Sequence, residues 1–117
     1  MAAQMETNGG RRETARAIYT RMLEEADDEK VKELAALRLA QVNSLDEREH
    51  IGQLLTSLRE RVGRCPQSWR EVATALRATG LRLDETGAPL DPADVPYVLD
   101  SATCEAKLSG RSPIPQK

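Results

Sequence analysis

The sequence predicts an α+β fold that is mostly helical, with four helices and a small C-terminal β-hairpin. Two observations lead to this prediction. Apolar residues recur at helical spacing through roughly the first two thirds of the chain. After Gly80 the composition changes to Pro, Gly and Asp, and two short segments of alternating character follow. The 117 residues have room for one small domain or two small modules.

The first two predicted helices, at about 11–26 and 28–43, form a helical hairpin. Spacings of 3, 1, 3 and 4 place one set of apolar side chains on a single face of the first helix: Ala15, Ile18, Tyr19, Met22 and Ala26. Asn8-Gly9-Gly10 is typical of a helix end. We therefore expect an earlier helix to stop there, as in a piece of a longer protein. Asp27-Asp28 predicts the start of the second helix, because acidic side chains cap helix N-termini.

The third and fourth predicted helices, at about 45–62 and 68–78, each begin at a capping-box pattern. In Ser44-Leu45-Asp46-Glu47, the serine and glutamate side chains can each accept a hydrogen bond from the other's backbone amide. Ser68-Trp69-Arg70-Glu71 repeats the pattern. We expect Trp69 to be a buried core anchor rather than a platform for stacking a ligand.

A β-hairpin is predicted near 96–108. Two short runs that can alternate between buried and exposed positions, 97–99 and 104–108, flank a polar turn. The predicted organisation is a helical hairpin at 1–43, a helix–helix–β-hairpin module at 44–112 packed on it, and a tail at 113–117.

Composition excludes several classes of function. There are 17 basic and 19 acidic residues, and no segment has the clustered positive charge of a nucleic-acid surface. The single histidine, His50, excludes a multi-histidine metal site. Five acidic residues are expected to form turns rather than a calcium site: Asp84, Glu85, Asp91, Asp94 and Asp100. We expect no catalytic residue, no metal and no cofactor. No apolar run approaches the ~20 residues of a membrane span, so this segment is not expected to insert into a membrane.

The two cysteines, Cys65 and Cys104, match no zinc-ligand spacing and no CxxC redox motif. We expect two small, half-buried residues. A disulfide between them would need an oxidising compartment, of which the sequence carries no sign. Whether they pair is left open at this point.

The segment from Gly10 to Leu23 resembles the second helix of a tetratricopeptide repeat. That family places a glycine at the turn between its two helices, a small residue five positions later and an aromatic residue four positions after that. Gly10, Ala15 and Tyr19 match these positions. The family has alanine where this chain has Met22, and its proline after the helix is missing. The resemblance implies a helical hairpin that packs on neighbours and binds protein partners.

The segment Asp91-Pro92-x-x-x-Pro96-Tyr97 is similar to a turn in type II secretion pseudopilins. The resemblance implies that Asp91 caps the turn, that Pro92 and Pro96 fix φ, and that Tyr97 points inward from the first strand. The pseudopilin motif has glycine where this chain has Asp94, so we expect Asp94 to adopt positive φ. The long apolar N-terminal helix of pseudopilins is absent from the sequence.

Residues 51–112 as a whole look like the C-terminal module of bacterial proteins of the tetratricopeptide type. These resemblances imply a non-enzymatic interaction or scaffold module, a fragment of a larger bacterial protein that acts in the cytoplasm or the envelope. The alternative is a structural component of an envelope or secretion assembly, which the pseudopilin-like turn implies.

Overall fold

A computed structural model describes residues 2–115 and the side chains of residues 10–115. The chain divides into two compact units, and the boundary falls between Asn43 and Ser44. We call residues 2–43 the hairpin unit and residues 44–115 the C-terminal unit.

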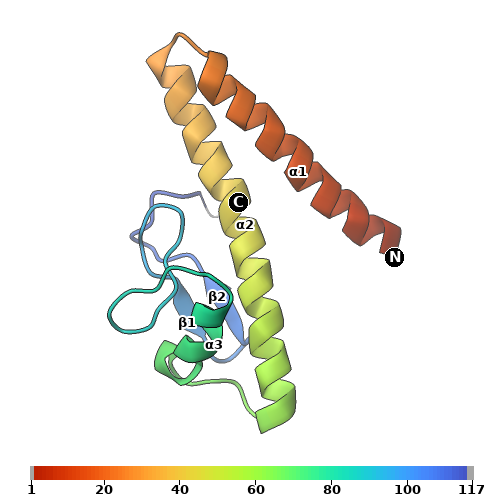
Figure 1. The fold of residues 1–117 in the computed structure, drawn as a ribbon, viewed down its shortest axis with the longest axis vertical. Coiled ribbons are helices and arrows are strands. Elements are labelled where there is room, and N and C mark those ends of the chain that lie inside the picture. Colours follow the sequence, from red (N-terminus) through yellow and green to blue (C-terminus); the bar gives the residue numbers. More distant parts are fainter. Residues whose placement is uncertain (1, 116–117) are drawn as a thin grey trace. The chain divides into compact units, whose positions relative to one another are not determined.

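The hairpin unit contains α1 (Ala2–Glu25) and the first half of α2 (Glu29–Val62), which run antiparallel (Figure 1). Asp28 caps the start of α2, since its Oδ1 accepts a hydrogen bond from the amide of Lys30 at 2.9 Å. Few side chains of this unit are withdrawn from solvent. Among residues 10–43, three are buried: Ala35, Gln41 and Val42.

The prediction of four helices is wrong, because the two expected at 28–43 and 45–62 are one continuous helix, α2. Residues 2–115 form three α-helices and one short 3-10 helix. No proline interrupts α2, and its one glycine, Gly52, costs a helix interior only about 1 kcal/mol. Ser44 and Glu47 therefore lie inside the helix, and neither caps a helix start.

The predicted helix end at Asn8–Gly10 is also wrong, because α1 runs through both glycines. Gly10 is exposed and has open space around the position of a Cβ atom. It does not lie at a turn between helices, as the tetratricopeptide resemblance implied. The turn of the hairpin lies at residues 26–28. Each glycine weakens a helix only slightly, so flanking helical sequence can carry the helix across.

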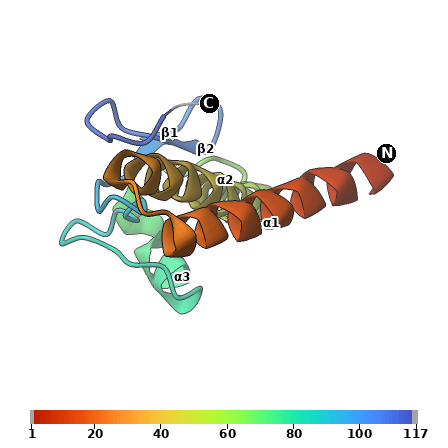
Figure 2. The ribbon, with the colours of Figure 1, turned by 90° about the horizontal axis from the view of Figure 1, so that it is seen from above.

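The C-terminal unit combines the second half of α2 with short elements. The single helix predicted at 68–78 is divided into a 3-10 helix at Trp69–Val72 and α3 at Ala73–Ala78. The predicted β-hairpin is confirmed. Strands β1 (Val98–Asp100) and β2 (Glu105–Lys107) pair antiparallel, with Leu99 opposite Ala106. The β-hairpin and α3 lie on different sides of this half of α2 (Figure 2).

The core of the C-terminal unit gathers side chains from α2, the 3-10 helix, α3, β2 and the loops. Its buried apolar members include Ile51, Leu55, Trp69, Val72, Leu76, Tyr97, Ala106, Leu108 and Ile114. Ile51 and Leu55 are one helical turn apart on α2, so the second half of that helix presents a continuous apolar stripe to this core. The loops and the hairpin of the unit are therefore held on a rigid helix.

Candidate interaction surfaces

Two consecutive seven-residue segments, 84–90 and 91–97, fold into the same turn. In the first copy, Asp84 Oδ1 accepts hydrogen bonds from the amides two and four residues later, at 2.8 and 3.0 Å. The fourth residue, Gly87, has φ 90°, and a Cβ atom there would lie 3.0 Å from the Cβ of Ala73. Backbone conformation and close packing against α3 both require glycine at this position.

The second copy of the turn carries the pseudopilin-like pattern. Asp91 Oδ1 accepts from the amides two and four residues later, at 2.7 and 3.0 Å, so the predicted cap is present. Asp94, the fourth residue, has φ 66°, which confirms the predicted left-handed conformation. Asp94 is exposed and forms an ion pair with Arg82. A side chain is therefore tolerated here, whereas a Cβ atom at Gly87 would press against Ala73.

The Asp91 carboxylate also fastens the C-terminal segment to this turn. Asp91 is fully buried, and its Oδ2 accepts a hydrogen bond from Ser112 Oγ at 2.7 Å. Ser112 Oγ in turn accepts from the amide of Ile114 at 3.3 Å, and Ile114 is buried. Part of the predicted tail is thus a packed strap. Residues 116 and 117 lie outside the described part of the chain.

Tyr97 points inward, as predicted, and only 2% of it is exposed. Its hydroxyl donates to Glu47 Oε1 at 2.6 Å and lies 2.9 Å from Ser44 Oγ. The two residues expected to cap a helix are therefore the partners of this tyrosine. Burial raises the pKa of Glu47, and the Tyr97 hydrogen bond partly offsets that rise. Burial and the Glu47 carboxylate raise the pKa of Tyr97 above its usual range, so its hydroxyl stays a donor.

Trp69 is buried, with 9% of it exposed, which confirms its predicted role as a core anchor. Its indole Nε1 donates to the backbone oxygen of Tyr97 at 2.9 Å, so the 3-10 helix is tied to the residue before β1.

Glu71 Oε2 accepts from the amide of Ser68 at 3.2 Å, which is the glutamate half of the predicted capping box. The pKa of Glu71 is lowered by its backbone and Arg64 hydrogen bonds.

Cys65 and Cys104 form a disulfide, with their Cα atoms 5.7 Å apart. The sequence left their pairing open, and the expectation that both are half-buried is wrong, because both are buried. The fold brings the loop after α2 against the turn of the β-hairpin, and a separation of 39 residues leaves no local pattern that could indicate the pair. Cys104 also has positive φ, at 58°.

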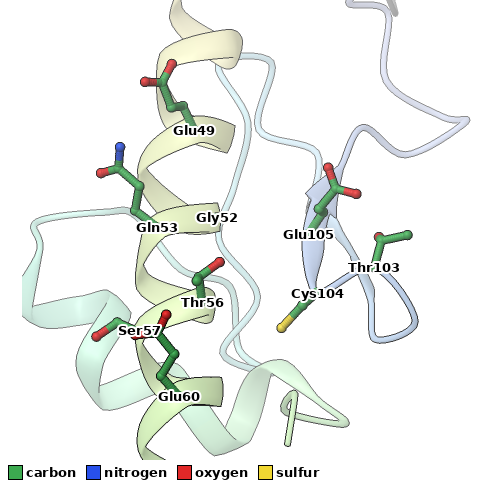
Figure 3. A pocket seen from close by; sticks show the side chains of 9 residues that line it. All are labelled: Glu49, Gly52, Gln53, Thr56, Ser57, Glu60, Thr103, Cys104 and Glu105. Carbon is green, nitrogen blue, oxygen red and sulfur yellow. The ribbon is translucent and has the colours of Figure 1, made fainter. Parts of the chain in front are cut away.

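An open groove of about 450 Å³ lies beside this disulfide (Figure 3). Residues of α2 form one wall and residues 103–105 form the other. The lining is polar and acidic: Glu49, Gly52, Gln53, Thr56, Ser57, Glu60, Thr103, Cys104 and Glu105. Among the described residues, no group of three or more His, Cys, Asp or Glu side chains is placed to hold a metal ion. The groove is therefore a concave surface with acidic rims.

Large apolar side chains remain exposed in both units, and in the C-terminal unit these are Leu45, Val62 and Val98. Ile18, predicted on the packed face of the first helix, is 52% exposed, and Leu34 on α2 is 49% exposed. Ala15 and Tyr19 are half-buried. Arg16 Nε donates to Asn43 Oδ1 at 2.8 Å, which links the two helices of the hairpin.

The structure brings one group of the predicted site residues together around Tyr97, and the other group is spread along a single helix. Trp69 and residues 91–97 meet around Tyr97 in the C-terminal unit, whereas Gly10, Ala15 and Tyr19 all lie on α1. Sequence reasoning missed the roles of Ser44, Glu47 and Ser112, the disulfide and the tandem turn. The turn did leave a signal, since Asp84, Gly87 and Pro89 stand seven residues before Asp91, Asp94 and Pro96.

Comparisons with protein-family models, with curated proteins and with solved structures found no match to this chain. Within residues 2–115, no helix combines the length and the apolar character needed to cross a bilayer.

Proposed function

We propose that this chain is a non-enzymatic interaction module that binds another protein through its helical hairpin. The observation that carries the proposal is the exposed apolar surface of the hairpin unit. A pair of helices has too little interior to bury its apolar side chains alone, and stacking on a further element supplies the missing cover. Ile18 and Leu34 are large apolar side chains of the kind that such contacts bury.

The roles of the polar groups in the C-terminal unit support a structural rather than a catalytic reading. Asp91 caps a turn and fastens the C-terminal strap. Glu47 accepts from Tyr97, and the Trp69 indole holds a backbone oxygen. Each of these groups is occupied by contacts that maintain the fold.

The experiment measures the dissociation constant of each partner identified from the native cell, using wild-type chain and three lysine variants. Ile18→Lys and Leu34→Lys are expected to weaken binding about tenfold or more, because a buried apolar contact is replaced by a charge. Val98→Lys is the matched control, since Val98 is 50% exposed but lies on β1. Its dissociation constant should equal that of the wild type. Weakening by Val98→Lys alone would place the interaction surface on the C-terminal unit and reject the proposal.

A second candidate is a structural component of an envelope or secretion assembly. The disulfide between Cys65 and Cys104 favours it, because disulfides persist in oxidising compartments. The pseudopilin-like turn is consistent with the same assignment. Protein isolated from the native cell would be unfolded in denaturant, alkylated before reduction and then examined by mass spectrometry, because both cysteines are buried in the folded chain. Protection of both cysteines is expected for an envelope protein, and full alkylation without reductant would reject this candidate.

A further inference from the structure

One exposed line of α1 carries a basic, an apolar and an acidic side chain in turn. Arg11, Ile18 and Glu25 are seven residues apart, which is close to two helical turns, so they lie almost in line along the helix. The rise of the helix separates neighbouring members by about 10 Å. All three side chains are exposed. The line is therefore symmetric in spacing about Ile18 and opposite in charge at its two ends, and Glu25 also lies 3.6 Å from Arg21 of the same helix in an exposed ion pair.

Such a line is complementary to itself in one orientation. A twofold axis through Ile18 would pair the two isoleucines and bring Arg11 of each copy against the acidic Glu25 of the other. A parallel arrangement would instead place like charges opposite each other. Half-buried Ala15 and Met22 flank Ile18 and would enlarge the apolar centre.

We infer that the hairpin unit binds a second copy of this chain, with two α1 helices antiparallel about Ile18. This inference rests on the proposed function, because it names the partner of the hairpin surface. A twofold contact uses the same patch on both copies, so one self-complementary line is sufficient to build it. Two paired helical hairpins bring four helices together, which is a stable way to cover the apolar sides of short hairpins.

The two kinds of contact have different roles. The apolar centre supplies most of the affinity, because pairing removes the exposed part of Ile18 from water on both copies. The charges at the ends contribute less, since exposed ion pairs are weak, but they select the antiparallel orientation. The inference thus predicts a large effect at Ile18 and smaller, compensable effects at Arg11 and Glu25.

The first test is sedimentation equilibrium of the full chain over a wide concentration range. Wild type should be a reversible dimer, and Ile18→Lys should raise its dissociation constant about tenfold or more. Val98→Lys is the matched control, because Val98 is about as exposed as Ile18, at 50%, but lies on β1. It should leave the dissociation constant unchanged. A wild-type monomer at every concentration, or equal weakening by both variants, would overturn the inference.

The second test exchanges the charges and needs no change at the apolar centre. Arg11→Glu alone and Glu25→Arg alone should each weaken the dimer about threefold, because each places like charges opposite one another. The double variant should recover the wild-type dissociation constant, since the pairs are reversed but intact. A double variant weaker than both single variants would overturn the antiparallel arrangement. If the chain stays monomeric and Ile18→Lys still weakens binding to another protein, self-association fails while the proposed function stands.

Discussion

The hairpin unit and the C-terminal unit differ in how much of their stability comes from within. The C-terminal unit has fully buried Ile51, Leu55 and Leu76 and a disulfide between its loop and its hairpin. The hairpin unit buries three described side chains and leaves Ile18 half exposed. A unit with a buried core and a cross-link depends less on an outside cover than a unit with few buried side chains.

Removal of the disulfide should destabilise the C-terminal unit most. Closing a loop of this length restricts the unfolded chain by about 4 kcal/mol. Cys65→Ser combined with Cys104→Ser should lower the free energy of unfolding by about that amount, measured by denaturant unfolding with Trp69 fluorescence. Hydrogen exchange of α1 amides should remain as in the wild type. A loss of less than about 1 kcal/mol in the free energy of unfolding would show that packing alone holds the β-hairpin in place.

Aromatic truncation compares the two units directly. Trp69→Ala should cost about 3–4 kcal/mol, because it leaves a cavity and an unsatisfied Tyr97 backbone oxygen. Tyr19→Ala, in the half-buried environment of α1, should cost about 1 kcal/mol. Both values come from denaturant unfolding of the variants. Similar costs at the two positions would contradict the stated difference between the units.

The Tyr97 hydroxyl should contribute less than the aromatic core. Tyr97→Phe removes the hydrogen bonds to Glu47 and Ser44, and we expect a loss of about 2 kcal/mol in the free energy of unfolding. Ser44→Ala serves as the control, because Glu47 keeps its donor in that variant. It should cost less than Tyr97→Phe. The reverse order would show that Ser44, and not Glu47, is the important partner of the hydroxyl.

The tandem turn allows a comparison within the C-terminal unit. Asp94→Val should cost about 1–2 kcal/mol, since a β-branched side chain is strained at φ 66°. Asp94→Gly should be neutral within about 0.5 kcal/mol, because glycine adopts this conformation freely and the lost ion pair is exposed. Thermal melts of the two variants decide the point. Equal melting temperatures for the two variants would mean that the left-handed conformation is not maintained in solution.

The smallest expected effect is a pH dependence with a defined sign. Burial raises the folded pKa of Glu47 above its ordinary value of 4.5, so the folded chain holds more protons just above that pH. The contribution of Glu47 to stability therefore falls as the pH rises through this window. Glu47→Gln should remove the decline, so its stability relative to wild type should increase from pH 4.5 upward.

Asp100 is the control of opposite sign for this titration. Its hydrogen bond to Lys107 and those to two backbone amides lower its folded pKa to about 2. Its stabilising contribution is present above pH 3.8 and is lost as the pH falls toward 2. Asp100→Asn should reduce the pH dependence of the free energy of unfolding only in that acidic range. Parallel changes in the two variants across the same pH range would contradict both assignments.

The features that the sequence predicted correctly depend on residues close together along the chain. The β-hairpin near 96–108 follows from a turn between two short runs, and the conformation of Asp94 follows from one position in a turn motif. The burial of Trp69 follows from its place at the start of a short apolar helix face, and that of Tyr97 follows from the pseudopilin-like turn motif.

The features that were missed depend on tertiary context. A serine followed three residues later by a glutamate can lie either at a helix start or inside a helix. For Ser44 and Glu47, only the contact with Tyr97, about 50 residues away, tells the two cases apart. The disulfide joins residues 39 positions apart and has no local signature. Ile18 has the spacing of a core residue, but a two-helix unit has no second neighbour on that side to bury it.

The conformation of Cys104 places two conflicting demands on one residue. A positive φ favours glycine, but only cysteine can supply the sulfur that reaches Cys65. Loss of Cys65 by mutation would leave position 104 with a side chain in a strained conformation and without the disulfide. The two cysteines can therefore be lost by substitution without lasting strain only if position 104 becomes glycine or a short polar residue such as asparagine or aspartate. Sequences related to this chain should accordingly carry either both cysteines or, in their absence, glycine, asparagine or aspartate at the turn of the β-hairpin.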